Sequence, residues 1–207
     1  SFGVVSQLRR ITGVKKIGHA GTLDPLATGV LVCAVGRETT KKIDQVQKEI
    51  KVYEAEITLG ATSTTYDAEG EVSATQGAEP VSQAQIEKAI QVFVGEIEQV
   101  PPIFSAKKIG GKRAYQLDRE NKTVELKASR VMIHEIRIIS YDWPRLVLQV
   151  TCGKGTYIRS LAHDIGQELG VGGYLTMLRR TQVGDFTVDK AVPLDQLTAE
   201  NWVDYLQ

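Results

Sequence analysis

A lone carboxylate, Asp24, stands in a stretch whose residue types are suited to holding it still. The stretch runs Gly18-His-Ala-Gly-Thr-Leu-Asp-Pro-Leu-Ala-Thr-Gly-Val-Leu31. Its glycines can take backbone angles that other residues avoid, and Pro25 restricts the backbone at Asp24. Such a loop holds a lone carboxylate at the edge of the apolar run 30–35, which has the signature of a buried strand. The alternative is that Asp24 only caps a turn, which is a common use of an Asp-Pro pair.

A second charged residue, Arg159, stands where local electrostatics oppose it. Gly153-Lys-Gly-Thr156 precedes an apolar helical stripe, so Thr156 is the expected N-cap and Arg159 falls in the first turn. The helix dipole disfavours a cation there. The position therefore predicts a compensating anion, either Asp24 or a nucleic-acid phosphate, and the alternative is an ordinary surface arginine.

Two tyrosines each allow two interpretations. Residues 50–60 alternate in polarity, which predicts a half-buried strand with Tyr53 on its apolar face. Plain core packing would account for Tyr53, but an aromatic ring beside a catalytic carboxylate could also stack on a base taken out of its helix. The same two interpretations apply to Tyr157, next to the helix that carries Arg159.

The charges of the 207-residue chain cancel, with 25 Lys and Arg against 25 Asp and Glu, yet they are strongly segregated. Residues 1–42 carry seven basic and two acidic side chains, and residues 101–130 carry eight and three. Residues 67–100 carry seven acidic side chains and one lysine, and residues 185–207 carry five and one. This distribution predicts a basic face for a phosphate backbone and an acidic back, the alternative being solvated surface.

Several classes of function find no support in the sequence. Two cysteines are too few for a disulfide framework, and the three histidines lack metal-ligand spacing. Lys154 precedes the second glycine of its motif, which is wrong for a nucleotide P-loop. We therefore expect no cofactor and no metal. No apolar run approaches the roughly 20 residues that span a bilayer, and the first residues do not resemble a signal peptide, so we expect a cytoplasmic protein.

The helices and strands that must position these residues are predicted from the spacing of apolar residues and from the glycines and capping residues that end or begin each element. We expect Gly13 to end a first helix with apolar residues at 4, 5, 8 and 11, and Ser82 and Gln85 to form a capping box for another helix. Residues 101–115 are interpreted as an exposed, mobile basic loop rather than a regular element. The remaining expected elements are strands at 30–35, 50–60, 124–140 and 146–151, and helices at 39–46, 156–169 and 173–180, with Arg179 and Arg180 at the C-terminal end of the last.

The stretch around Asp24 resembles the catalytic motif of the TruB-type tRNA pseudouridine synthases, in which this aspartate is essential. The resemblance continues in order over residues 1–195. Its further segments are Lys51-Val-Tyr-Glu-Ala-Glu-Ile-Thr-Leu-Gly60, Thr64-Thr-Tyr-Asp-Ala-Glu-Gly70, Pro101-Pro-Ile-Phe-Ser-Ala-Lys-Lys-Ile-Gly-Gly-Lys-Arg-Ala-Tyr115, Cys152-Gly-Lys-Gly-Thr-Tyr-Ile-Arg-Ser-Leu161 and Gly172-Gly-Tyr-Leu-Thr-Met-Leu-Arg-Arg180.

The resemblance implies a single mixed α/β (α+β) catalytic domain over residues 1–207. It implies a largely antiparallel central sheet with flanking helices, an active-site cleft, and a basic thumb-like insertion at about 101–127. The implied reaction is the isomerisation of uridine 55 in the T-loop of tRNA to pseudouridine by a monomer. The residues that would contact substrate are His19, Gly21, Thr22, Asp67, Lys107, Lys108, Lys112, Arg113, Tyr157 and Leu178.

The resemblance also implies roles for the catalytic residues. Asp24 acts as nucleophile or as base, and Arg159 keeps its carboxylate ionised and oriented. Tyr53 stacks on the flipped base, and His19 wedges into the RNA loop as the base leaves. His134 and His163 are expected to be structural.

Two features of the family are not found in this sequence. Family members usually begin with a strand and a Lys-Pro motif just before the position of Ser1. Bacterial members often carry a C-terminal RNA-binding PUA domain, whereas about a dozen residues follow Asp195 here. The competing functions are a non-catalytic RNA-binding or tRNA-folding module and, more remotely, a glycoside-type hydrolase that would release free uracil.

Overall fold

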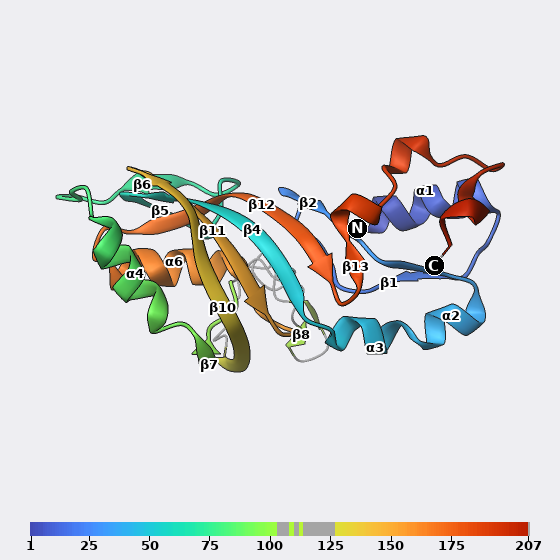
Figure 1. The fold of residues 1–207 in the computed structure, drawn as a ribbon, viewed down its shortest axis with the longest axis horizontal. Coiled ribbons are helices and arrows are strands. Elements are labelled where there is room, and N and C mark those ends of the chain that lie inside the picture. The colour runs from blue at the N-terminus through green and yellow to red at the C-terminus, as the bar shows by residue number, and fades with distance from the viewer. Residues whose placement is uncertain (103–107, 110–111, 114–126, 207) are drawn as a thin grey trace. The chain divides into compact units, whose positions relative to one another are not determined.

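The computed structural model describes residues 1–102, 108–109, 112–113 and 127–206. The fold is mixed α/β, with a central sheet and flanking helices (Figure 1). The chain forms two compact units, which we call unit 1 (Ser1–Val52 and Arg179–Gln207) and unit 2 (Tyr53–Leu178). That residues 1–207 act as a single catalytic domain stays a prediction.

Unit 1 combines short strands with short helices. Its strands are β1 (Ile17–His19), β2 (Ala27–Gly29), β3 (Cys33–Val35) and β13 (Phe186–Thr187). Its helices are α1 (Phe2–Thr12), α2 (Arg37–Lys41) and α3 (Ile43–Lys48), followed near the C-terminus by the 3₁₀ helices η1 (Val188–Lys190), η2 (Leu194–Gln196) and η3 (Trp202–Tyr205).

The expected first helix of unit 1 is confirmed. Helix α1 ends at Gly13, which adopts a left-handed conformation (φ 69°) and donates its N–H to the Arg9 carbonyl, 3.1 Å away. Its buried residues Val5 and Leu8 pack with Ile17 into the core of the unit. Removing these apolar side chains from water stabilises the helix more than its intrinsic propensity does.

Two other expectations for unit 1 are wrong in part. The expected strand at 30–35 is regular only at β3, because β3 pairs with β1 while β2 pairs with β12, and the Val30 N–H between them bonds to the Arg180 carbonyl. The expected helix at 39–46 is two short helices that meet at Lys42, and the first begins earlier, after Gly36 at φ 94°.

Unit 2 carries the long strands and the two best-packed helices. Its strands are β4 (Lys51–Leu59, which begins in unit 1), β5 (Ala61–Ser63), β6 (Val72–Ala74), β7 (Gly95–Gln99), β8 (Lys108–Ile109), β9 (Lys112–Arg113), β10 (Ser129–Asp142), β11 (Arg145–Cys152) and β12 (Gly173–Val183, which ends in unit 1). Its helices are α4 (Gln83–Gln91) and α6 (Ile158–Glu168).

The main sheet has the strand order β13-β12-β4-β11-β10-β7. Strand β10 pairs antiparallel with both β11 and β7, and β12 pairs antiparallel with β13. The predicted alternation along β4 is confirmed, because Ala55, Ile57 and Leu59 are buried while the residues between them are half-buried. The turn at 142–145 joins β10 to β11 as expected, through a cis bond between Trp143 and Pro144.

Helix α4 confirms the predicted capping box. The Ser82 hydroxyl accepts the Gln85 N–H, and the Gln85 side chain accepts the Ser82 N–H in return. Its buried residues are Ile86, Ala89 and Ile90, and α4 lies beside α6 (Figure 1). The helix stops before Gly95, which is the first residue of β7.

The helix expected at 173–180 is wrong, because this segment is part of strand β12. Leu175 and Leu178 have the spacing of one helical face, and both are buried. Gly173, however, packs so closely on α6 that an added Cβ would lie 2.9 Å from the Ala162 carbonyl. The Thr176 hydroxyl bonds to the Glu56 carbonyl of β4 at 3.1 Å, so neighbouring strands decide the conformation here.

The basic segment 101–115 is described only in part. Strands β8 and β9 pair antiparallel, with Lys108 opposite Arg113 and Ile109 opposite Lys112. A short hairpin-like pair therefore stands where no regular element was expected. Lys107 lies outside the described residues, as does most of the predicted thumb insertion. In the described part of the chain, no helix is both long enough and apolar enough to cross a bilayer.

Candidate active site

The Asp24 loop connects β1 to β2 within unit 1, and it is a turn as the sequence predicted. The Ala27 N–H bonds to the Asp24 carbonyl at 3.0 Å, which closes the turn around Pro25. The Leu23 N–H bonds to the Ser1 hydroxyl at 2.9 Å and so ties the loop to the start of α1. Asp24 itself is half-buried.

Three further residues of the predicted substrate set lie in this loop or next to it. Gly21 has φ 85°, an angle that favours glycine, and Thr22 is exposed. His19 ends β1 opposite Cys33 of β3 and is half-buried. Burial lowers the pKa of His19, which favours the neutral imidazole near neutral pH. Burial also raises the pKa of the Cys33 thiol to about 11, so this cysteine is a poor nucleophile.

Arg180 is the residue that the sequence analysis missed in unit 1. It is only 1% exposed, and its Nε donates to the Val30 carbonyl at 2.8 Å while its Nη2 donates to the Gly21 carbonyl at 3.2 Å. An added Cβ on Gly29 would lie 2.1 Å from the Arg180 carbonyl, so the two backbones touch. Reading residues 173–183 as a strand would not by itself have identified Arg180, because the buried positions change phase between Gly173 and Leu175 on one side and Leu178 and Arg180 on the other.

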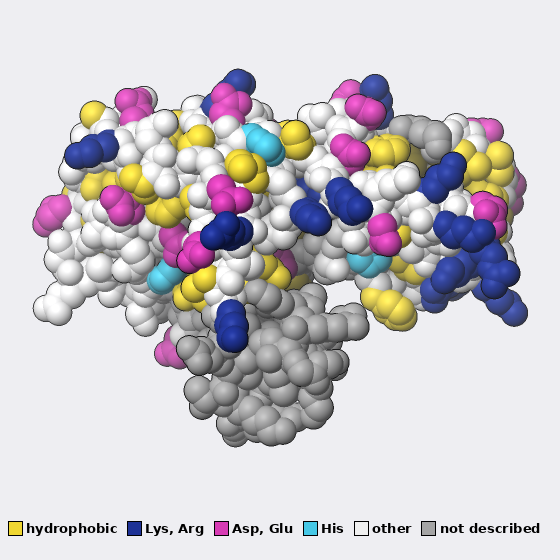
Figure 2. Space-filling view, turned by 90° about the horizontal axis from the view of Figure 1, so that it is seen from below, with side chains coloured by type: hydrophobic (Ala, Val, Ile, Leu, Met, Phe, Trp, Pro, Cys, Tyr) yellow, Lys and Arg dark blue, Asp and Glu magenta, His cyan; other side chains and the backbone are white. Residues whose placement is uncertain are grey.

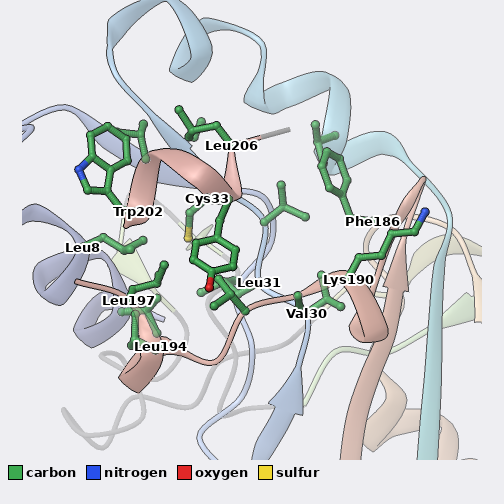
Figure 3. A pocket seen from close by; sticks show the side chains of 18 of the residues that line it. Leu8, Val30, Leu31, Cys33, Phe186, Lys190, Leu194, Leu197, Trp202 and Leu206 are labelled. Atoms are coloured by element: carbon green, nitrogen blue, oxygen red, sulfur yellow. The ribbon is translucent and has the colours of Figure 1, made fainter. Parts of the chain in front are cut away.

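Unit 1 also holds a groove of about 890 Å³ at its C-terminal 3₁₀ helices, and Figure 3 shows the apolar side chains that surround it. The groove shares Gly29 and Val30 with the end of the Asp24 loop but contains none of the predicted site residues. It is therefore separate from the candidate active site. Its labelled lining residues are Leu8, Val30, Leu31, Cys33, Phe186, Lys190, Leu194, Leu197, Trp202 and Leu206.

In unit 2, Arg159 lies in the first turn of α6, where the sequence placed it. The N-cap is Tyr157 rather than the predicted Thr156, because the Thr156 hydroxyl donates to the Gly153 carbonyl at 3.1 Å instead. The buried Gln99 holds the N-cap from both sides, accepting the Tyr157 N–H at 2.7 Å and donating to the Tyr157 carbonyl at 3.0 Å. The end of β7 thereby determines where α6 begins.

A buried carboxylate compensates the charge of Arg159. The Arg159 Nη1 lies 3.2 Å from Asp67 Oδ2, and the two side chains are 5% and 1% exposed. Asp67 is held in turn by the Thr65 hydroxyl and by the Glu69 N–H, both of which donate to its Oδ1. Asp67, which the sequence analysis expected only as a substrate contact, thus compensates Arg159, whereas the expected partner, Asp24 or a phosphate, stays a prediction.

A stacked pair of rings lies next to this ion pair in the chain. Tyr66 has φ 63°, and its ring stacks on His163 of α6 with 4.0 Å between centroids and 13° between planes. The Tyr66 carbonyl accepts the Leu175 N–H at 3.0 Å. Burial lowers the pKa of His163, in keeping with a neutral, structural histidine, and burial followed by the nearby Asp164 charge raises the pKa of Tyr66.

The predicted site residues therefore fall in both units. Asp24, His19, Gly21 and Thr22 belong to unit 1, whereas Tyr53 and Arg159 belong to unit 2. Tyr53 is half-buried on β4, Leu178 is buried on β12, and Tyr157 is half-buried at the start of α6. A contact between Asp24 and Arg159 stays a prediction. Among the described residues, no cluster of three or more His, Cys, Asp or Glu side chains could hold a metal ion.

Comparison with known proteins assigns the chain to a family. Residues 9–158 match the family model described as TruB family pseudouridylate synthase (N terminal domain), and residues 159–206 match the tRNA pseudouridylate synthase B C-terminal domain. The chain belongs to the TruB family. It is accordingly a pseudouridine synthase, an isomerase that converts uridine to pseudouridine.

Relatives named tRNA pseudouridine synthase B match nearly the whole chain. The protein from Phocaeicola vulgatus is 46% identical, with 99% of this chain and 88% of that protein covered. The protein from Thermobifida fusca is 48% identical, with 97% and 71% covered. A third, from Mycobacterium sp. (strain KMS), is 50% identical, with 97% and 68% covered.

Solved structures share the fold. A chain in the crystal structure of a Cbf5-Nop10-Gar1 complex has a TM-score of 0.73 and 27% identity, with 99% of this chain and 52% of that chain covered. A chain in the structure of an H/ACA RNP bound to a substrate RNA containing 2'-deoxyuridine has a TM-score of 0.70 and 25% identity, with 100% and 52% covered. Our TruB-family chain thus spans about half the length of these structural neighbours.

Proposed function

We propose that this TruB-family chain isomerises uridine 55 in the T-loop of tRNA to pseudouridine. The observation that carries the proposal is the buried Arg159–Asp67 pair at the N-terminus of α6. A guanidinium carries five N–H donors in a rigid planar fork, so the contact with Asp67 orients the whole cation. The names of the curated relatives support tRNA as the substrate.

The reaction rearranges bonds without adding or losing atoms overall. The bond between N1 of the uracil and C1′ of the ribose breaks, the base turns, and a bond between C5 and C1′ forms. C5 then loses its hydrogen as a proton, and N1 gains one. No electrons leave the substrate, so the residues of the chain need only supply a nucleophile or base, electrostatic stabilisation and orientation.

Within this proposal Asp24 acts as the nucleophile or the base. The Arg159 guanidinium contacts its carboxylate, keeps it ionised and fixes its direction. Tyr53, at the start of the part of β4 that belongs to unit 2, stacks on the flipped base and takes part in the final proton removal. His19 is neutral because burial lowers its pKa, so it can enter the RNA loop without carrying a charge.

The RNA is bound through its phosphates. In unit 1 the basic residues Lys15, Lys16, Arg37, Lys41 and Lys42 are exposed, and Figure 2 shows Lys and Arg side chains gathered at the right of that view. In unit 2 the predicted contacts are Lys107, Lys108, Lys112 and Arg113. We propose that a monomer of this chain holds the T-arm through these two basic regions in the cytoplasm, where binding should weaken steeply as salt rises.

The test is a conversion assay with unmodified tRNA that carries tritium at C5 of its uridines. The wild-type chain should release tritium and form pseudouridine, detected by nucleoside chromatography. Asp24→Asn should abolish both while leaving tRNA affinity within about twofold, because only the reacting carboxylate is lost. Asp44→Asn, which removes an exposed carboxylate on α3, is the matched control and should leave the rate unchanged.

Each failure has a distinct meaning. Binding of tRNA with no tritium release by the wild-type chain would favour the non-catalytic RNA-binding module. Release of free uracil would favour a hydrolase. Conversion by Asp24→Asn at the wild-type single-turnover rate would remove Asp24 from the mechanism. No finding in the structure or the comparisons favours the two alternative functions.

A further inference from the structure

Arg180 closes the Asp24 loop at both of its ends. One carbonyl that it holds, at Gly21, lies three residues before Asp24, and the other, at Val30, lies six residues after it. The backbone of Arg180 adds a third link, because the Val30 N–H donates to the Arg180 carbonyl at 2.8 Å. A single side chain thus ties the entry and the exit of the loop to β12.

The close approach at Gly29 makes this arrangement specific. Gly29 has φ 96°, and any Cβ there would overlap the Arg180 carbonyl. Gly21 has φ 85°, and a Cβ there would lie 3.4 Å from Arg180 Nη1, within contact distance but without overlap. The glycines of the motif therefore serve the approach of the loop to Arg180 as well as the turn itself.

The partners of this guanidinium are neutral. Among the described residues, no Asp or Glu forms an ion pair with Arg180, although its side chain is 1% exposed. A buried cation costs more to desolvate than an apolar side chain of similar size, so packing alone does not account for an arginine here. What an arginine offers and an apolar residue lacks is a rigid fork that can bond two carbonyls at once.

We propose that Arg180 is a positioning residue, which fixes the direction of Asp24 for the chemical step by bonding both ends of its loop. The inference rests on the proposed function of Asp24. It does not require Arg180 to touch the substrate, since its side chain is buried beneath the loop. The loss of positioning should appear in the rate of the chemical step and not in the affinity for RNA.

The test compares Arg180→Lys with the matched change Arg179→Lys. Lysine keeps the charge but presents a single ammonium that cannot span both carbonyls in the geometry of the fork. For Arg180→Lys we expect a single-turnover rate about 10- to 100-fold lower, as for a reacting group displaced by about 1 Å, with the Kd for tRNA within about twofold. Arg179 is exposed, and its replacement should leave the single-turnover rate unchanged.

A second measurement tests directly whether Arg180 holds the Asp24 loop in place. Hydrogen exchange at the Leu23 and Ala27 amides should accelerate in Arg180→Lys, while the amides of α1 keep their wild-type protection. Leu8→Ala, a truncation in the core of unit 1, serves as a control that lowers stability without touching the loop; it should leave the single-turnover rate intact. If Arg180→Lys does not fold, Gly21→Ala strains the loop backbone at φ 85°, beside the carbonyl that Arg180 bonds, and should show the same loss of single-turnover rate and faster exchange at Leu23 and Ala27.

Three outcomes distinguish a failure of the positioning role of Arg180 from a failure of the proposed function. A wild-type single-turnover rate in Arg180→Lys, or in Gly21→Ala if Arg180→Lys does not fold, would overturn the positioning role of Arg180. Equal rate losses in Leu8→Ala and Arg180→Lys would also overturn it, because general destabilisation would then explain both. A wild-type chain that makes no pseudouridine would instead refute the proposed function, and the exchange of the loop amides would still report whether Arg180 holds the loop.

Discussion

Two buried arginines, one in each unit, balance their charge in opposite ways. Arg159 in unit 2 is buried and faces the carboxylate of Asp67, while Arg180 in unit 1 is buried and faces two backbone carbonyls. In the first case each charge makes the other tolerable. In the second case the neutral carbonyls offset the cost of burying the Arg180 charge less completely. The hydrogen bonds instead fix the backbone to which the carbonyls belong.

The two arginines differ in whether the surrounding backbone positions the side chain or the side chain positions the backbone. Around Arg159 the surrounding turn positions the side chain, because Thr65 and the Glu69 N–H hold Asp67, and Gln99 holds the start of α6. Around Arg180 the relation is reversed, and the side chain positions the turn. The predictions below test this contrast, beginning with the largest expected effect.

Asp67→Ala should be the most damaging change to stability. It leaves the Arg159 cation buried without its carboxylate, and breaking a buried pair in this way costs about 3–5 kcal/mol of the free energy of unfolding. Urea unfolding would measure the loss. Glu135→Ala is the control, since its ion pair with Arg137 is 2.7 Å long but exposed and should contribute less than about 1 kcal/mol. Equal effects of the two changes would contradict the role of Asp67.

Arg180→Met should cost less stability than Asp67→Ala. It leaves the buried Val30 carbonyl short of a donor, at about 1–3 kcal/mol, while the Gly21 carbonyl is only partly buried and no charge is stranded. The same unfolding measurement ranks the two variants. A loss as large as that of Asp67→Ala would show that the Arg180 charge is compensated in some stronger way, and the contrast between the two arginines would fail.

Asp164→Asn extends the contrast to a half-buried acid and should have the smallest effect. Burial raises the pKa of Asp164 to about 6, above its ordinary value of 3.8. The folded state therefore binds the proton more tightly than the unfolded state, and the contribution of Asp164 to stability falls as pH rises from about 4 to 6. The midpoint of thermal unfolding of Asp164→Asn, relative to wild type, should rise across this range and then level off.

A matched acid shows whether this pH dependence is specific. Asp185 is exposed, and Asp185→Asn, measured over the same pH range, is the control. A flat difference for Asp164→Asn would mean that its carboxyl ionises in the folded protein as it does in water.

Local sequence predicted those elements whose cause is local. The apolar spacing and Gly13 predicted α1, and the reciprocal side-chain bonds of Ser82 and Gln85 predicted the start of α4. The alternation of residues 50–60 predicted β4. In each case the deciding interactions join residues within a few positions of one another or follow from one repeated burial pattern.

Prediction failed where distant partners decided the outcome. Leu175 and Leu178 fit a helical face, but pairing with neighbouring strands and the close packing of Gly173 on α6 make the segment a strand. The expected cap by Thr156 was wrong because Gln99, 58 residues earlier in the chain, already satisfies the N-cap. These partners are separated by dozens of residues, and local propensities differ by too little to anticipate them.

For the candidate site, the sequence by itself determined the identity of the chemical groups. It placed Asp24 on a glycine- and proline-constrained loop, set Arg159 in the first turn of a helix, and carried the family motifs. Only the tertiary structure showed that Asp67 is the anion beside Arg159 and that Arg180, 150 residues from Val30, is the donor that bonds both ends of the Asp24 loop. Burying a cation requires partners, and the chain supplies them from positions that meet only after folding.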